Sequence, residues 1–81
     1  MRGEVFVTPH AAKRYAERVE PCSHEDAISR IVEDIRNRTS VRKGRDGCVI
    51  VTGPRPRRVR YHVSPPLPGH TLPAVVTVVT R

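Results

Sequence analysis

The sequence is poor in aromatic residues, with one phenylalanine, two tyrosines and no tryptophan among its 81 residues. Proteins that bind single-stranded nucleic acid without sequence preference stack the bases on aromatic side chains. Three aromatic residues are too few to build such a platform. The composition therefore argues against a binding mode that depends on base stacking.

The sequence also lacks a pattern that binds a metal or a cofactor. Cys22 and Cys48 stand apart with no C-x-x-C spacing, and the four histidines are well separated. Glu33 and Asp34 are adjacent, so they point to different faces of a helix. The glycine-containing segment 44–47 lacks the Lys-Ser/Thr pair that completes a phosphate-binding P-loop. We therefore expect no metal and no cofactor.

No segment resembles a targeting signal or a membrane span. The N-terminal MRGEVFVTPH has no apolar core of the kind that signal peptides contain. The longest apolar stretch, LPAVVTVVT, is much shorter than a bilayer requires. We predict a cytoplasmic protein with no membrane partner, whose thiols are reduced.

Positive charge is abundant, and it is concentrated in the second half of the chain. Residues 1–35 carry five basic and seven acidic side chains, whereas residues 36–81 carry ten basic and one acidic. Such clustering is typical of proteins that bind nucleic acid or an acidic partner. Because arginine outnumbers lysine 13 to 2, genomic base composition together with solubility is the alternative explanation. The candidate nucleic-acid-binding residues are Arg42, Lys43, Arg45, Arg55, Arg57, Arg58 and Arg60.

Two helices are expected in the first half of a single domain that spans residues 1–81. Thr8 as N-cap and Pro9 in the first turn predict a helix that continues to about Val19. Ser23 opens a second helix in a capping box with Asp26. Apolar residues then recur every three or four positions, which predicts a helix face directed at the core: Ala27, Ile28, Ile31, Val32 and Ile35.

Beyond residue 39 the pattern changes to the two-residue period of strands. Residues 47–52 and 57–63 predict strands, with Tyr61 directed at the core. Residues 40–43 are either a strand or an extended linker, and residues 4–7 form a short β-like opening. Residues 74–80 are apolar on both faces, which is typical of a central, well-covered strand. The predicted fold is therefore α+β, with two N-terminal helices packed on a three- to four-stranded antiparallel β-meander.

A spacing of four residues places His10, Arg14 and Arg18 on one strip of the first helix. A metal-independent ribonuclease must activate a 2′-hydroxyl, protonate a leaving oxygen and stabilise a phosphorane. An imidazole and guanidiniums are suited to these tasks. The candidate catalytic residues are these three and His62, provided that the helix strip and the polar face of residues 58–62 converge. The alternative is that both are solvated surfaces.

The order of these motifs resembles the RelE/BrnT-type toxin fold, and most closely the DUF4258-like proteins. T-P-H-A-x-x-R-x-x-x-R comes early, an acid-capped helix follows, and the meander ends in VVTVVT. The resemblance implies a RelE/BrnT-like fold, whose members include ribonucleases of toxin–antitoxin systems. The proline-rich loop 65–73 departs from the pattern. The matching positions are His10, Ala11, Arg14, Arg18, Gly47, Val49, Val51 and Thr77.

These observations predict a small basic RNA-binding protein, with toxin-like ribonuclease activity as the more specific hypothesis. The sequence leaves open whether the protein is an enzyme. The alternative is a phage or bacterial interaction protein that binds a host protein or an acidic antitoxin. Edge pairing of the final strand would give a homodimer, provided that this strand is not covered on both sides.

Overall fold

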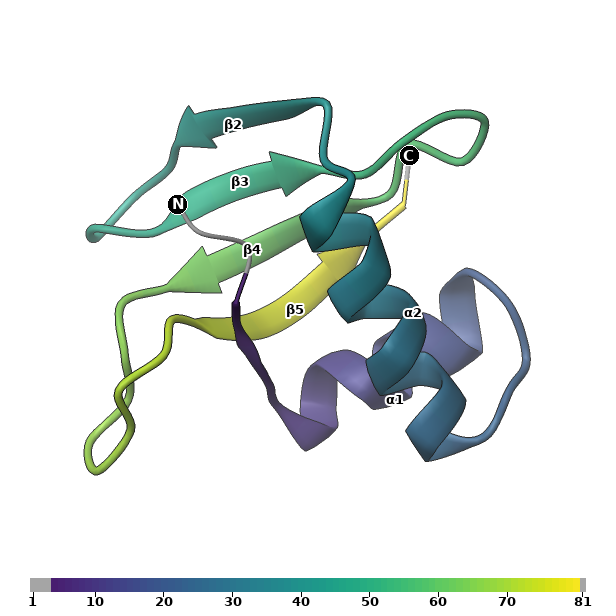
Figure 1. Ribbon diagram of the computed structural model, residues 1–81, viewed down its shortest axis with the longest axis horizontal. Helices are drawn as coiled ribbons and strands as arrows, with labels where there is room; N and C mark the ends of the chain where they lie inside the picture. Colours follow the sequence, from purple (N-terminus) through teal and green to yellow (C-terminus); the bar gives the residue numbers. More distant parts are fainter. Residues whose placement is uncertain (1–3, 81) are drawn as a thin grey trace.

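The computed structural model describes residues 4–80, and it shows two helices packed against a five-stranded sheet (Figure 1). The α+β class predicted from the sequence is confirmed. The elements in chain order are β1 (Phe6–Val7), α1 (Pro9–Arg18), α2 (His24–Arg36), β2 (Ser40–Lys43), β3 (Val49–Thr52), β4 (Arg60–Ser64) and β5 (Ala74–Val79).

The sheet is mixed, which corrects the predicted antiparallel meander of three to four strands. The strand order is β1-β5-β4-β3-β2, and only β2 to β5 form an antiparallel meander. Phe6 and Val7 pair in parallel with Ala74 and Val75. A strand of two residues has no periodicity to detect, and its partner lies at the other end of the chain. The residues 40–43, which the sequence left undecided, form an edge strand.

Both helices begin where the caps predict. The Ser23 hydroxyl accepts a hydrogen bond from the Asp26 N–H at 3.1 Å, which caps α2. The Thr8 hydroxyl accepts from the Ala11 N–H at 3.2 Å and donates to the Val75 carbonyl at 2.8 Å. Thr8 therefore caps α1 and also fixes its first turn against β5.

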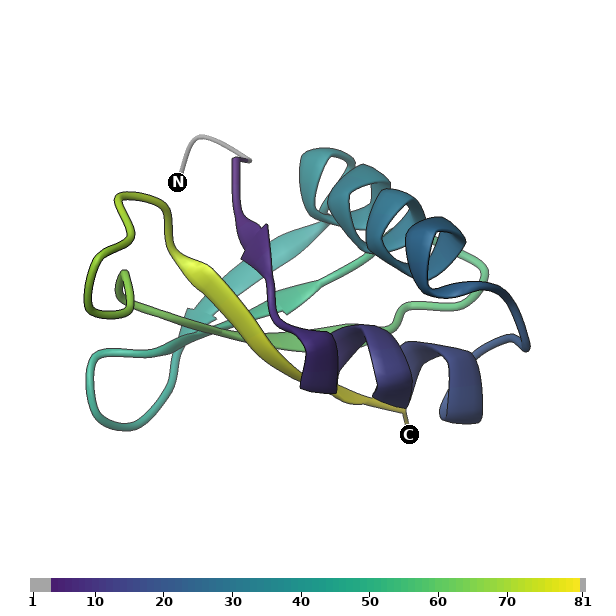
Figure 2. The same ribbon diagram turned by 90° about the horizontal axis from the view of Figure 1, so that it is seen from below.

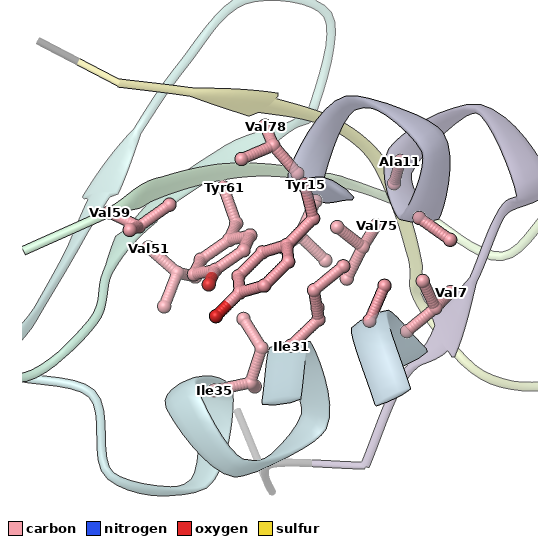
Figure 3. Packing of buried hydrophobic residues seen from close by; sticks show 13 residues of the cluster. Val7, Ala11, Tyr15, Ile31, Ile35, Val51, Val59, Tyr61, Val75 and Val78 are labelled. Carbon is pink, nitrogen blue, oxygen red and sulfur yellow. The ribbon is translucent and has the colours of Figure 1, made fainter. Parts of the chain in front are cut away.

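The core lies between the helices and one face of the sheet. Tyr15, Ile31 and Ile35 of the helices meet Tyr61 and the buried valines of the sheet (Figure 3). Tyr61 is fully buried, as its alternation with valines predicts. Figure 2 shows α2 lying across the sheet and α1 alongside the end of β5. Neither helix within residues 4–80 is long and apolar enough to cross a membrane.

β5 is central, as predicted, but it is covered on one face only. It lies between β4 and β1, and Val75 and Val78 are fully buried. Thr77 and Val79 lie on the opposite face and are half-buried. Because β5 already pairs with a strand on each side over Ala74 and Val75, the condition for dimerisation through its edge is not met there. The exposed edge of the sheet is β2, all four residues of which are exposed.

Candidate nucleic-acid-binding groove

The face of the sheet that the helices leave open is hollowed into a broad groove of about 720 Å³. Four arginines and one histidine line it. Within the described part of the chain, no carboxylate is among the lining residues, which are Ser40, Arg42, Ile50, Thr52, Pro56, Arg57, Arg58, Arg60, His62 and Val79. A concave surface with charge of one sign concentrates a positive potential that attracts polyanions.

Strand alternation directs β4 side chains into the groove. Burial of Tyr61 and Val63 against the helices fixes the face that these residues occupy, so Arg60 and His62 must lie on the other face. In the ladder, Arg60 is opposite Thr52 and His62 is opposite Ile50. On the edge strand, Arg42 is also opposite Ile50, so it extends the same row across β3.

The loop between β3 and β4 supplies two more arginines, Arg57 and Arg58. Arg58 has a φ of 51°, in the left-handed region that non-glycine residues rarely adopt. Its N–H donates to the Pro54 carbonyl at 3.0 Å, and the Gly53 N–H donates to the Val59 carbonyl at 2.8 Å. These bonds hold the loop in a conformation that costs about 1 kcal/mol at an L-residue. Backbone strain of this kind is concentrated at functional sites.

The groove gathers part of the predicted nucleic-acid-binding set. Arg42, Arg57, Arg58 and Arg60 line it together with His62. The remaining predicted residues, Lys43, Arg45 and Arg55, are exposed but are not among its lining residues.

The helix strip predicted for catalysis lies outside this groove. Arg14 Nε is 3.5 Å from His10 Nε2, and Arg14 Nη1 is 3.3 Å from the Glu17 carboxylate. His10 and Arg18 are exposed on α1. Of the four candidate catalytic residues, only His62 lines the groove. Catalysis by the helix strip stays a prediction, and the structure does not place the strip beside His62.

A polar cluster at the core boundary was missed by the sequence analysis. The Tyr61 hydroxyl donates a hydrogen bond to Asp34, and Arg57 Nη1 donates to the Tyr15 hydroxyl oxygen at 3.2 Å. Arg57 Nη1 also lies 2.6 Å from Glu20 Oε1. The available signal was the assignment of Tyr61 to the core, because a buried hydroxyl needs a hydrogen-bond partner.

Burial and charge shift the ionisation of this cluster in opposite directions. Burial raises the pKa of the Asp34 carboxyl above its ordinary value of 3.8, although the hydrogen bond from Tyr61 opposes the shift. Burial, and then the hydrogen bond to Asp34, raises the pKa of Tyr61, so its hydroxyl stays protonated. The hydrogen bond from Arg57 lowers the pKa of Glu20, which therefore carries its negative charge at neutral pH.

The arrangement can hold phosphate groups and place one imidazole beside them. Guanidiniums bind phosphate oxygens through paired, charge-assisted hydrogen bonds. His62 is the imidazole among the described lining residues, and imidazole is the side chain most often used for general acid–base catalysis. Residues 4–80 contain no group of three or more His, Cys, Asp or Glu placed to hold a metal ion.

Comparisons with protein-family models, with curated proteins and with solved structures each found no match to this chain. The groove itself is therefore the feature that indicates a function.

Proposed function

We propose that this protein binds RNA in the cytoplasm through the open face of its sheet. The observation that carries the proposal is the convergence of Arg42, Arg57, Arg58 and Arg60 in one groove whose lining residues, among those described, include no carboxylate. Surface arginines placed for solubility alone have no reason to share a concavity. The groove therefore favours polyanion binding over the explanation from base composition.

The groove is suited to the RNA backbone rather than to stacked bases. Its described lining includes no aromatic ring other than the His62 imidazole. Contacts of arginines to phosphates, and of hydroxyls to 2′-hydroxyls, recognise the shape of structured RNA without reading its sequence. Ser40 and Thr52 supply hydroxyls beside the arginines. RNA is preferred to DNA here because of the resemblance to RelE/BrnT-type toxins.

Cleavage of the bound RNA is the more specific form of this proposal. His62 would accept the proton of a 2′-hydroxyl as the 2′-oxygen attacks phosphorus. The bond to the 5′-oxygen would break, and that oxygen would take a proton from water. Arg58 and Arg60 would stabilise the extra negative charge on the phosphorane. His62→Gln should then abolish cleavage while binding persists.

A mobility shift with a labelled RNA hairpin, and with a DNA hairpin of the same sequence, tests RNA binding. Arg60→Gln should raise the Kd for RNA about ten-fold, because a charge-assisted contact is worth ~1.5 kcal/mol. Arg45→Gln is the matched control, since Arg45 lies outside the groove and its loss removes the same charge. Equal losses for the two variants would contradict a specific groove, and preference for the DNA hairpin would contradict the assignment to RNA.

The exposed edge strand supports a second candidate, which is binding of an acidic protein partner. β2 pairs on one side only, and it presents Arg42 and Lys43. An extended acidic segment can add to such an edge as a further strand. This candidate predicts that neither hairpin binds, and that an acidic partner protects the β2 amides from hydrogen exchange.

A further inference from the structure

Two arginines from different elements bracket one carboxylate next to the groove. Glu20, in the loop between α1 and α2, lies 2.6 Å from Arg57 Nη1 and 3.0 Å from Arg30 Nη1. The Tyr15 hydroxyl oxygen accepts a hydrogen bond from the same Arg57 nitrogen. Tyr15 is almost fully buried, so it anchors this guanidinium. The Arg57 guanidinium is thus held in place by the buried Tyr15 hydroxyl and by the charged Glu20 carboxylate.

Arg57 connects this cluster to the groove. It lines the groove and also a second depression of about 320 Å³, whose wall includes Tyr15, Arg30 and Asp34. The side chains of Arg57, Arg30 and Glu20 are 49%, 40% and 35% exposed. The pair of Arg57 with Glu20 is therefore open to solvent, whereas the Arg30 Nη1 atom that faces Glu20 is itself buried. A polyanion that follows the groove therefore meets Arg57 at its margin.

The two guanidiniums are not fully satisfied by Glu20. Among the described residues, Arg30 Nη1 is buried and has no hydrogen bond of good geometry, although it lies close enough to Glu20 for an ion pair. A carboxylate offers two oxygens in one plane, and the phosphodiester of RNA offers two non-bridging oxygens in a tetrahedral arrangement. Because the same donors bind both anions, a phosphate can replace the carboxylate. Exposed ion pairs are weak enough for such an exchange.

We propose that Arg30 and Arg57 form a phosphate site at the margin of the groove, which the chain's own Glu20 carboxylate occupies until RNA displaces it. Tyr15 is a positioning residue that keeps Arg57 in place during the exchange. The inference rests on the proposed function, since it assigns one further phosphate contact to the same RNA. It makes Glu20 an internal competitor that lowers the affinity for RNA.

Removal of the competitor should strengthen binding. Glu20→Gln should lower the Kd for the RNA hairpin roughly two- to five-fold, the range expected for release of an exposed ion pair. Glu17→Gln is the matched control, because it removes the same charge from α1 and leaves Arg57 untouched. In the Arg57→Gln background the advantage of Glu20→Gln over Glu17→Gln should shrink, because Arg30 alone is then left for Glu20 to occupy.

A measurement on the unaltered protein keeps the inference testable if Glu20→Gln does not fold. The carboxyl carbons of Glu20 and Glu17 can be titrated by NMR in the free and the RNA-bound protein. The pKa of Glu20 should rise on binding by more than that of Glu17, because Glu20 loses Arg57. Equal affinities for Glu20→Gln and Glu17→Gln, or a Glu20 pKa that does not move, would overturn the inference alone. No binding of RNA by the unaltered protein would overturn the proposed function as well.

Discussion

At the scale of single residues, Arg58 is an arginine in a backbone conformation that favours glycine. Its φ of 51° lies in the left-handed region, and its side chain lines the groove. A glycine at this position would relieve the strain and remove the charge. The presence of arginine indicates that the side chain is worth more to the protein than the stability that glycine would add.

Arg58→Gly should therefore separate stability from binding. The free energy of unfolding should rise by as much as about 1 kcal/mol, because the left-handed conformation no longer opposes a Cβ atom. The affinity for the RNA hairpin should fall. Arg58→Gln is the control, since it loses the charge but keeps the strain. Urea denaturation and the mobility shift measure the two quantities, and equal stability of the two variants would argue against strain at Arg58.

Asp34 and Tyr61 form the other pair whose chemistry depends on single side chains. At the edge of the core, the Asp34 carboxyl accepts a hydrogen bond from the Tyr61 hydroxyl. Gly53 lies against the Asp34 side chain. A Cβ atom at Gly53 would approach the Asp34 side chain to 3.3 Å. The absence of a side chain at this position leaves room for the carboxyl.

The raised pKa of Asp34 predicts a defined pH dependence. Because folding raises this pKa, the contribution of Asp34 to stability is fully present below its unfolded value near 3.8 and declines as pH rises through the folded value. Asp34→Asn keeps an acceptor for Tyr61 and does not titrate. Its stability relative to the unaltered protein should therefore increase with pH across the acid range. Urea denaturation from about pH 3 to pH 7 measures this trend, and a constant difference between the two proteins would contradict it.

At the scale of elements, Thr8 connects a helix cap to the sheet. Its hydroxyl accepts a hydrogen bond from the Ala11 N–H of α1 and donates one to the Val75 carbonyl of β5. The Ser23 hydroxyl, by contrast, accepts only the cap bond from the Asp26 N–H among the hydrogen bonds of residues 4–80. The two N-caps look alike in sequence, but Thr8 bonds to both its helix and the sheet, whereas Ser23 bonds to its helix.

Thr8→Ala should cost more than Ser23→Ala. Loss of a cap costs about 1 kcal/mol, and loss of the bond to β5 should add about 1 kcal/mol at Thr8. Thr8→Ser should restore most of the stability, because it keeps the hydroxyl. The measurement is the midpoint of urea unfolding at constant m-value. Equal losses at Thr8 and Ser23 would show that the bond to Val75 adds nothing.

The elements also show what the sequence could and could not predict. Caps and periodicity are local, so the starts of both helices and the outward direction of Arg60 and His62 followed from the sequence. The parallel pairing of Phe6 with Ala74 depends on residues far apart in the chain, and two residues carry no pattern. The cluster of Glu20 with Arg30 and Arg57 was missed for the same reason.

At the scale of the whole molecule, charge is separated between the helices and the open face of the sheet. The segment 9–36, which contains both helices, carries six acidic and five basic side chains and is nearly neutral. The lining of the groove carries arginines with no carboxylate among its described residues. Part of the basic half of the sequence thus gathers on one face, because the meander brings Arg42 and Arg60 to the same side of the sheet.

The affinity for RNA should fall steeply with salt, because each bound phosphate releases counterions. With about four phosphate contacts, the logarithm of the binding constant should fall with the logarithm of salt with a slope of roughly −3 to −4. Arg60→Gln should reduce the magnitude of this slope by about 1, and Arg45→Gln should leave it unchanged. Titrations between about 50 and 200 mM salt measure the slope. Affinity that does not depend on salt would contradict binding through the arginines.

The parallel pairing of β1 with β5 also determines when the protein can fold during its synthesis. Until β5 has left the ribosome, Thr8 has no strand to bond, and the buried faces of Tyr15 and Ile31 have only part of their partners. The chain between Val7 and Ala74 must close into a loop before β1 and β5 can pair, and closing so long a loop slows folding. During synthesis, the first turn of α1 therefore lacks its bond to the sheet, and β1 lacks its partner, until β5 has emerged.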